Sequence, residues 1–155
     1  MLFRSATGPG AEVFAATAEP TGHADRTKSD ISFNFGTLTY TIQPKSPATS
    51  FDVWVGGTKF TISSPQTVTL PGSPPASGLY YIFFDIAGTL GIQTTYFIWD
   101  KQAPTSYIYY NSVAGQYILF DERHGITMDW ATHEYLHRTR GAAIADRKST
   151  RLNSS

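Results

Sequence analysis

The stretch FDVWVGGTKFTIS, residues 51–63, decides the fold class of this chain. Aromatic and β-branched residues dominate its two halves, and Gly56-Gly57 lies between them. Such side chains fit the pleated surface of a sheet, and glycine adopts the positive φ angles that a two-residue hairpin turn requires. The stretch therefore predicts a β-hairpin with strands at residues 51–55 and 58–63.

Short runs of the same character continue on both sides of this hairpin, separated by turn-forming residues. They cover residues 31–36, 37–44, 66–70, 79–85, 90–99, 106–110 and 116–121. The last four runs pair by proximity into two further hairpins. A series of short strands is typical of all-β proteins. We therefore expect a mainly β fold: an antiparallel β-sandwich or barrel-like domain of short hairpins over residues 31–121, followed by one C-terminal α-helix.

Three of these runs are apolar on both faces. In LYYIFFD (79–85), each alternate set of side chains is aromatic or aliphatic, and the runs at 106–110 and 116–121 behave alike. An exposed apolar patch larger than a few hundred Å² is unusual on a monomer. The sheet is therefore either covered on both sides or forms a contact between subunits, and we favour the subunit contact.

Both ends of the chain resemble a translated sequencing adapter. Leu-Phe-Arg-Ser, near the start, can be encoded by CTC TTC CGA TCT. The reverse complement, AGATCGGAAGAG, encodes Asp-Arg-Lys when read one base later, and these residues open the tail DRKSTRLNSS. We therefore expect residues 1–5 and 146–155 to be adapter artefacts that flank an internal fragment of a longer protein. Residues 6–30 then form a flexible arm with His23 exposed to solvent.

Residues 122–145 predict a corner followed by a helix. The segment MDWATHEYLHRTRGAAIA (128–145) begins near Asp129, a suitable N-cap, and reaches a natural stop at Gly141. A charged cluster precedes this helix and is expected to fix the corner through ion pairs and hydrogen bonds. Its members are Glu122, Arg123 and His124.

The helix contains the pattern H-E-x-x-H within THEYLH, residues 132–137. His133 and His137 are i and i+4, so both imidazoles project from one face and could share a zinc ion, with Glu134 as general base. No His, Glu or Asp follows within the expected native part, and Arg138 adds an unfavourable charge. We therefore expect an amphipathic docking helix, no metal or other cofactor, and no enzymatic activity. The alternative is a zinc-dependent hydrolase.

Composition excludes several function classes. The formal net charge is zero and 15% of the residues are charged, so neither a nucleic-acid footprint nor an acidic tail is present. There are no cysteines, which excludes disulfides and thiolate metal sites. No apolar run is long enough for a membrane span. Since aromatic-rich β-sandwiches can stack sugars, a carbohydrate-binding module is a further alternative, with Trp54 and Trp99 as the candidate rings.

Four stretches resemble a class of tailed-phage virion proteins found in the tail, the baseplate or in association with tail fibres. They are FDVWVGGTKFT (51–61), GLYYIFFD (78–85), ERHG (122–125) and THEYLHRTRGA (132–142). The resemblance implies a non-enzymatic structural protein that acts by oligomeric assembly and host attachment. Its implied partners are further copies, other virion proteins and a host surface receptor. Its implied location is the virion, after assembly in the host cytoplasm.

Overall fold

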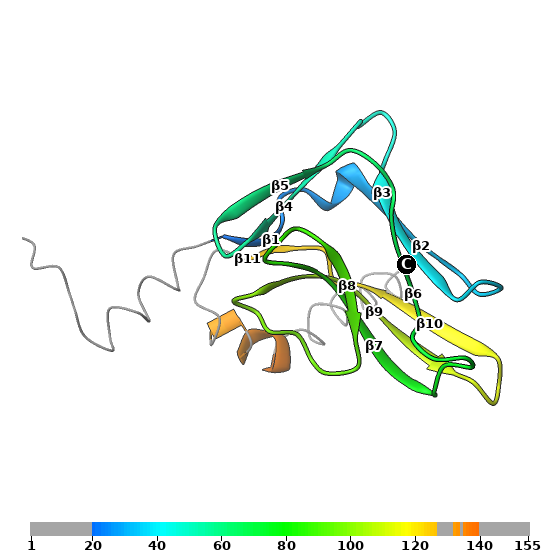
Figure 1. The fold of residues 1–155 in the computed structure, drawn as a ribbon. Helices are drawn as coiled ribbons and strands as arrows, with labels where there is room; N and C mark the ends of the chain where they lie inside the picture. Colours follow the sequence, from blue (N-terminus) through cyan, green and yellow to red (C-terminus); the bar gives the residue numbers. More distant parts are fainter. Residues whose placement is uncertain (1–19, 127–131, 134, 140–155) are drawn as a thin grey trace, which may run out of the picture. The chain divides into compact units, whose positions relative to one another are not determined.

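The computed structural model describes residues 20–126, 132–133 and 135–139. The chain divides into two compact units: Glu19–Gly125, which we call the β-unit, and a second that joins Met1–Ala18 to Ile126–Ser155. The described part of the chain is mainly β, with a short helix near its C-terminal end (Figure 1). The expected fold class is therefore confirmed.

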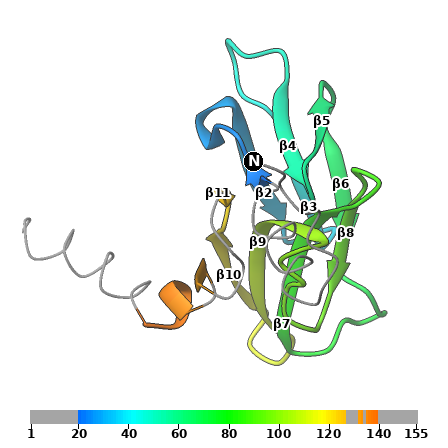
Figure 2. The ribbon, with the colours of Figure 1, turned by 90° about the vertical axis from the view of Figure 1, so that its left-hand side faces the viewer.

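Antiparallel pairing organises the strands into three sheets. Their orders are β11-β1-β4-β5, β10-β9-β7-β8 and β2-β3-β6 (Figures 1 and 2). The elements are β1 (Thr21–His23), the 3₁₀ turn η1 (Arg26–Lys28), β2 (Ser29–Asn34), β3 (Thr39–Pro44), β4 (Phe51–Val55), β5 (Thr58–Ile62), β6 (Gln66–Thr69), β7 (Gly78–Asp85), β8 (Leu90–Gln93), β9 (Gln102–Asn111), β10 (Gln116–Asp121) and β11 (Gly125–Ile126).

The Gly-Gly hairpin forms as predicted. Phe51 pairs with Ile62 and Val55 with Thr58, and Gly56 and Gly57 take φ angles of 52° and 77°. Two successive positive φ angles match the right-handed twist of the flanking strands. The hairpins expected from β7 with β8 and from β9 with β10 also form.

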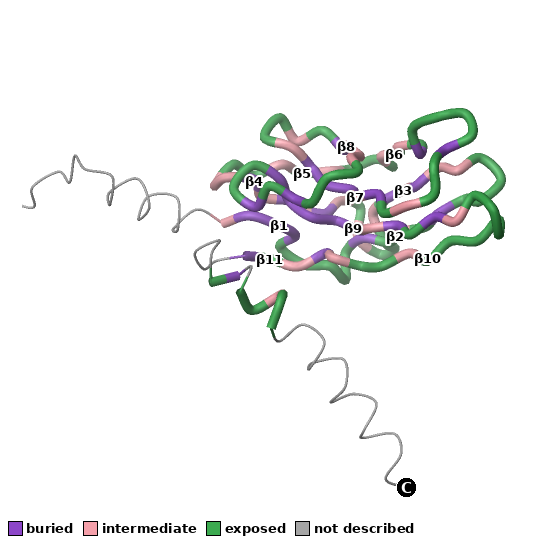
Figure 3. Tube along the Cα trace, turned by 90° about the horizontal axis from the view of Figure 1, so that it is seen from below, coloured by how far each residue is buried: buried purple, intermediate pink, exposed green. Residues whose placement is uncertain are grey.

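The core of the β-unit lies between the inner faces of its sheets. Tyr40 and Ile42 from β3 pack in one cluster with Ile82 and Phe84 from β7 and Ile108 from β9, and all five are fully buried. Figure 3 shows buried stretches along β1, β3, β7 and β9, whereas β10 is mostly exposed. In the strands that are apolar on both faces, the core thus covers only one of the two faces.

Residues 20–30 differ from the expected flexible arm. Thr21–His23 form β1, which pairs with β4, and His23 is buried rather than exposed to solvent. The backbone N–H of His23 also donates to the His124 carbonyl at 2.9 Å. The polar composition of this segment misleads because its burial depends on pairing with strands that lie far away in sequence.

The predicted strand at 90–99 is too long. Strand β8 ends at Gln93, and the loop that follows is held by side-chain amides. The Gln93 amide donates to the carbonyls of Thr95 and Tyr96, and the Gln102 amide oxygen accepts from the Ile98 backbone N–H at 2.7 Å. These bonds replace ladder pairing with a compact aromatic loop.

The helix contains residues 132–133 and 135–139, and Thr139 donates its hydroxyl to the Tyr135 carbonyl one turn earlier. The proposed N-cap Asp129, the stop at Gly141 and the adapter segments all lie outside the described residues. Within the described ranges, no helix is long and apolar enough to cross a membrane.

Candidate functional site

Six apolar side chains form two rows across β7, β9 and β10 on the face opposite the core; we call them the outer face. Strand register sets each row, because directly opposed residues of neighbouring strands point to the same side of a sheet. The rows are Leu79, Tyr109 and Ile118, and Tyr81, Tyr107 and Phe120. The inward residues Tyr80 and Ile108, which lie between the rows, and Tyr110, which lies beside them, are buried in the core.

Most of the outer face is open to solvent. Leu79 is 40% exposed, Tyr109 41% and Ile118 53%, which is high for large apolar side chains. The rings of Tyr107 and Phe120 stack with centroids 4.4 Å apart and planes 16° from parallel. None of the six residues is charged, so the face presents a pre-formed apolar surface without polar side chains to desolvate apart from the tyrosine hydroxyls.

The aromatic loop after β8 extends this surface. Tyr81 contacts the rings of Tyr96 and Phe97, with centroids 5.5 Å and 5.2 Å away. Tyr96 and Ile98 remain exposed, at 42% and 51%. Hydrogen bonds from the side-chain amides of Gln93 and Gln102 hold the loop. The side chains of Tyr96 and Ile98 are therefore positioned before any partner binds.

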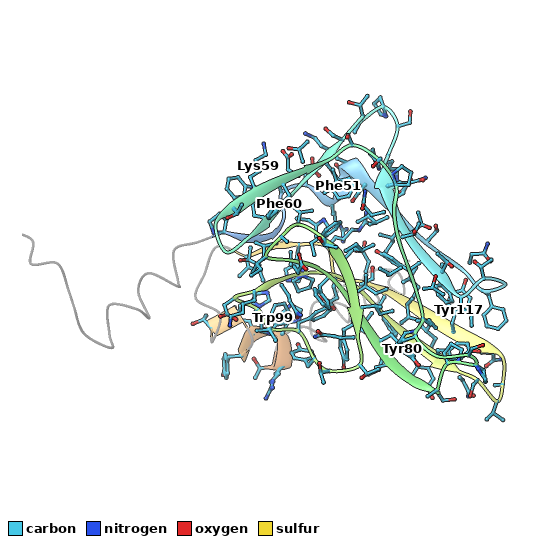
Figure 4. All side chains as sticks on the ribbon, in the orientation of Figure 1. Phe51, Lys59, Phe60, Tyr80, Trp99 and Tyr117 are labelled. Carbon is cyan, nitrogen blue, oxygen red and sulfur yellow. The ribbon has the colours of Figure 1, made fainter. Side chains whose placement is uncertain are left out.

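A pocket of about 440 Å³ lies at the β9–β10 hairpin and continues from the outer face through Tyr109 and Ile118. Its lining also includes Phe35, Asn111, Gly115, Gln116 and Tyr117. Phe35 and Tyr117 stack with centroids 5.9 Å apart, and Figure 4 shows Tyr117 at this end of the β-unit. No lining residue is charged. No sequence pattern indicates this pocket, because Phe35 reaches it from the turn between β2 and β3, far from β9 and β10 in sequence.

The corner residues lie where β10 ends. The Arg123 guanidinium donates to both carboxylate oxygens of Asp121 at 2.8 Å, and its Nη1 donates to the Ser29 hydroxyl at 2.8 Å and to the Ser29 carbonyl. Nη1 also donates to the Arg26 carbonyl at 3.2 Å. The neighbouring guanidinium lowers the pKa of Asp121 by hydrogen bonding and charge, against the effect of burial. Arg123 thus fastens the end of β10 to the start of β2.

The other two corner residues, Glu122 and His124, lie next to each other, with the His124 Nδ1 atom 3.8 Å from a Glu122 carboxylate oxygen. The Nδ1 atom of His124 lies 2.7 Å from the Glu122 carbonyl, and the Glu122 backbone N–H donates to the Thr105 carbonyl at 3.0 Å. Burial, with a smaller contribution from the Asp121 charge, raises the pKa of Glu122 to about 7. These contacts hold the segment between β10 and β11, so the expected corner leads into a further strand among the described residues.

A buried polar seam continues from the corner into the β-unit. His23 contacts the Thr105 hydroxyl at 3.2 Å, and Tyr40 contacts the Ser106 hydroxyl at 2.9 Å. Burial and, less strongly, the Arg123 charge lower the pKa of His23 to about 3, so its imidazole is neutral. Burial also raises the pKa of Tyr40. His23 and Tyr40 are both neutral, and each is hydrogen-bonded to a hydroxyl. We therefore assign this seam a structural role.

The two histidines of the H-E-x-x-H pattern lie side by side. The ring centroids of His133 and His137 are 4.6 Å apart, with their planes at 50°. His133 is 6% exposed and His137 is partly buried. Burial lowers the pKa of His137, which favours its neutral, metal-binding form. Glu134, the proposed general base, lies outside the described residues.

The two tryptophans do not form a sugar-stacking platform. Trp99 is only 6% exposed and packs against Tyr96 and Phe97 within the aromatic loop (Figure 4). Trp54 is partly buried in β4, which belongs to a different sheet from β8. Sugar stacking requires an exposed ring, so the burial of Trp99 argues against Trp99 as a sugar-binding residue.

Comparison with known proteins gives no match: no family model, no curated protein and no solved structure resembles the chain. The candidate functions are therefore weighed on the surfaces of the described residues. Among these surfaces, the outer face is an apolar one that the core of the β-unit leaves uncovered.

Proposed function

We propose that this chain is a non-enzymatic structural protein that acts by oligomeric assembly through the outer face of its β10-β9-β7 sheet. The observation that carries the proposal is the pair of apolar rows that the core does not cover. Burying a large apolar side chain completely contributes about 1.5–3 kcal/mol. Two rows of three such side chains therefore supply a substantial driving force for association.

The composition of the face favours a protein partner. Stable interfaces are depleted in charged residues at their centre and enriched in aromatic ones, and four of the six outer-face residues are Tyr or Phe. The hydroxyls of the three tyrosines can hydrogen-bond at the rim of such a contact. We take the partner to be a further copy of the chain or another component of the same assembly.

The proposal extends to the setting of the assembly. The resemblance of FDVWVGGTKFT, GLYYIFFD, ERHG and the helix to tailed-phage virion proteins supports a tail or baseplate as the larger particle. Other virion proteins and a host surface receptor are then the further partners. Mass spectrometry of purified virions whose genome encodes this chain tests this part, and a protein absent from the particles would contradict it.

The assembly itself is tested by replacing Ile118, at the end of one row, with lysine. We expect the wild-type protein to associate as its concentration rises in analytical ultracentrifugation, and Ile118→Lys to reduce the association by at least about tenfold, since each 1.4 kcal/mol changes an equilibrium constant tenfold. Leu79→Lys, at the other end of the same row, should act in the same direction.

Val113 provides the matched control because it is 95% exposed in the turn between β9 and β10, outside the two rows. Val113→Lys adds the same charge at another exposed apolar position and should associate like the wild type. A wild-type protein that stays monomeric at every concentration, or equal effects of Ile118→Lys and Val113→Lys, would contradict the proposal.

A further inference from the structure

The helix presents two imidazoles one turn apart. Residues at i and i+4 lie on the same helix face, and the centroids of the His133 and His137 rings are 4.6 Å apart. One ring nitrogen of each lies within 4.8 Å of the other. We propose that His133 and His137 together bind a divalent transition-metal ion, with Zn²⁺ as the reference ion, and that this ion clamps the helical turn between them.

The distances suit two nitrogen ligands on one ion. A zinc–imidazole bond is about 2.0–2.1 Å long, so two nitrogens on a tetrahedral zinc are about 3.3 Å apart. Small side-chain rotations bring the two rings to this separation, and water can complete the coordination. Imidazole binds Zn²⁺, Cu²⁺ and Ni²⁺ well, whereas Ca²⁺ and Mg²⁺ prefer oxygen ligands. The pair should therefore select transition metals.

The surroundings of the pair restrict access of solvent to its rings. His137 is partly buried. His133 is 6% exposed, so little solvent surrounds its ring. Arg138, which follows His137, is exposed, and solvent screens its charge. The unfavourable charge noted in the sequence therefore opposes binding only weakly.

The inferred role of the ion is structural and does not depend on the proposed assembly. An isolated helix of this length is marginal in water, because its first turn is expensive to form. An ion shared by residues i and i+4 joins successive turns and couples metal binding to helix formation. This role needs no general base, so it involves no step at Glu134.

Isothermal titration with ZnCl₂ tests the site on the untagged chain, since a polyhistidine tag would bind the same ions. We expect saturable binding that EDTA reverses, with affinity at least about tenfold lower in His133→Ala and in His137→Ala. Cu²⁺ provides a second readout, because its electron paramagnetic resonance spectrum reports directly coordinated nitrogens. The wild type should show at least two nitrogens, and each alanine variant should show fewer.

Two controls separate a metal site from a general effect on the helix. Tyr135→Ala changes an exposed residue of the same helix and should bind zinc like the wild type. The double variant His137→Ala/Arg138→His keeps the number of histidines but moves the second imidazole off the i+4 position, and it should bind as weakly as His137→Ala. Absence of saturable zinc binding by the wild type, or unchanged affinity in either single alanine variant, would overturn the proposal.

Discussion

Two edge strands of the β-unit, β5 and β10, differ in the side chains that they expose: those of β5 are polar or charged, whereas those of β10 are largely apolar. Among the described strands, each lies at the end of its sheet and belongs to a hairpin. Strand β5 exposes Thr58, Lys59 and Thr61. Strand β10 exposes Tyr117, Ile118 and Phe120. Proteins usually protect an edge with charge, because unpaired N–H and C=O groups invite another strand.

The difference shows which edge is protected and which is available. The ammonium group of Lys59 lies 3.0 Å from the Asp52 carboxylate, and Figure 4 shows Lys59 on the outside of β5. Strand β10 has no charge from Gln116 to Phe120, and its Arg123 anchor lies beyond the strand's end. The β10 edge is thus fixed in place but left apolar, as an assembly surface requires.

The largest expected effect concerns the two ion pairs that accompany these edges. Arg123→Met should lower the free energy of unfolding by about 3 kcal/mol, because it removes a guanidinium that is only 9% exposed and that donates to the Asp121 carboxylate and to both the hydroxyl and the carbonyl of Ser29. Lys59→Met, the matched change on β5, should alter it by less than about 1 kcal/mol, since the side chains of that pair are 48% and 33% exposed. Urea denaturation measures both, and equal losses would contradict this difference.

An intermediate effect on stability is expected from His23 and Glu122, whose contributions change with pH in opposite directions. His23 has a pKa of about 3 in the fold against 6.5 unfolded, so it contributes stability above pH 6.5 that is lost as the pH falls towards 3. Glu122 has a pKa of about 7 against 4.5, so it contributes stability below pH 4.5 that is lost as the pH rises through 7. The two oppose each other between pH 4.5 and 6.5.

Replacing either His23 or Glu122 should reveal the effect of the other group on the pH dependence of stability. Glu122→Gln should lose up to about 1.4 kcal/mol of stability per pH unit on acidification below pH 6.5, more steeply than the wild type. His23→Gln should lose less than the wild type, or gain stability, over the same range. Urea denaturation measures the free energy of unfolding of each variant at each pH. The contribution of the other carboxylates is common to all variants and cancels in the differences between them. Parallel profiles for all three proteins would rule out this linkage.

Local sequence chemistry accounts for the part of the fold that could be predicted. The Gly56-Gly57 turn and its flanking runs are determined by neighbouring residues, whereas the two apolar faces of LYYIFFD left open whether the second face is covered by the fold or by another subunit. Strand β1 could not be predicted, because the burial of His23 depends on β4 and on the His124 carbonyl about one hundred residues later.

The candidate site was predictable only in part, for a similar reason. Residue type suggested Trp99 as an exposed ring, but the side-chain amides of Gln93 and Gln102 fold its loop so that the indole is buried. Phe35, in the turn between β2 and β3, stacks on Tyr117 at the pocket, and no local pattern encodes this contact. The i, i+4 spacing of His133 and His137 is local, and the two rings do lie together.

The smallest change in stability is expected for Lys59→Ile, and this variant directly tests whether side-chain character distinguishes the β5 edge from the β10 edge. Lys59→Ile removes the charge that protects β5 and gives this edge the apolar character of β10. Because Lys59 is exposed, the free energy of unfolding should change by less than about 1 kcal/mol. Association should nevertheless increase in a background where Ile118→Lys has weakened contact through the outer face.

Analytical ultracentrifugation of the Ile118→Lys/Lys59→Ile protein measures this effect, with Ile118→Lys/Lys59→Gln as the control that removes the charge without adding an apolar side chain. If edge character governs association, the isoleucine variant self-associates and the glutamine variant associates less. If neither associates, charge on β5 is not what keeps this edge unpaired. The protection would then lie in the geometry of the strand rather than in its side chains, and the uncharged surface of β10 would lose its significance as the sign of an assembly edge.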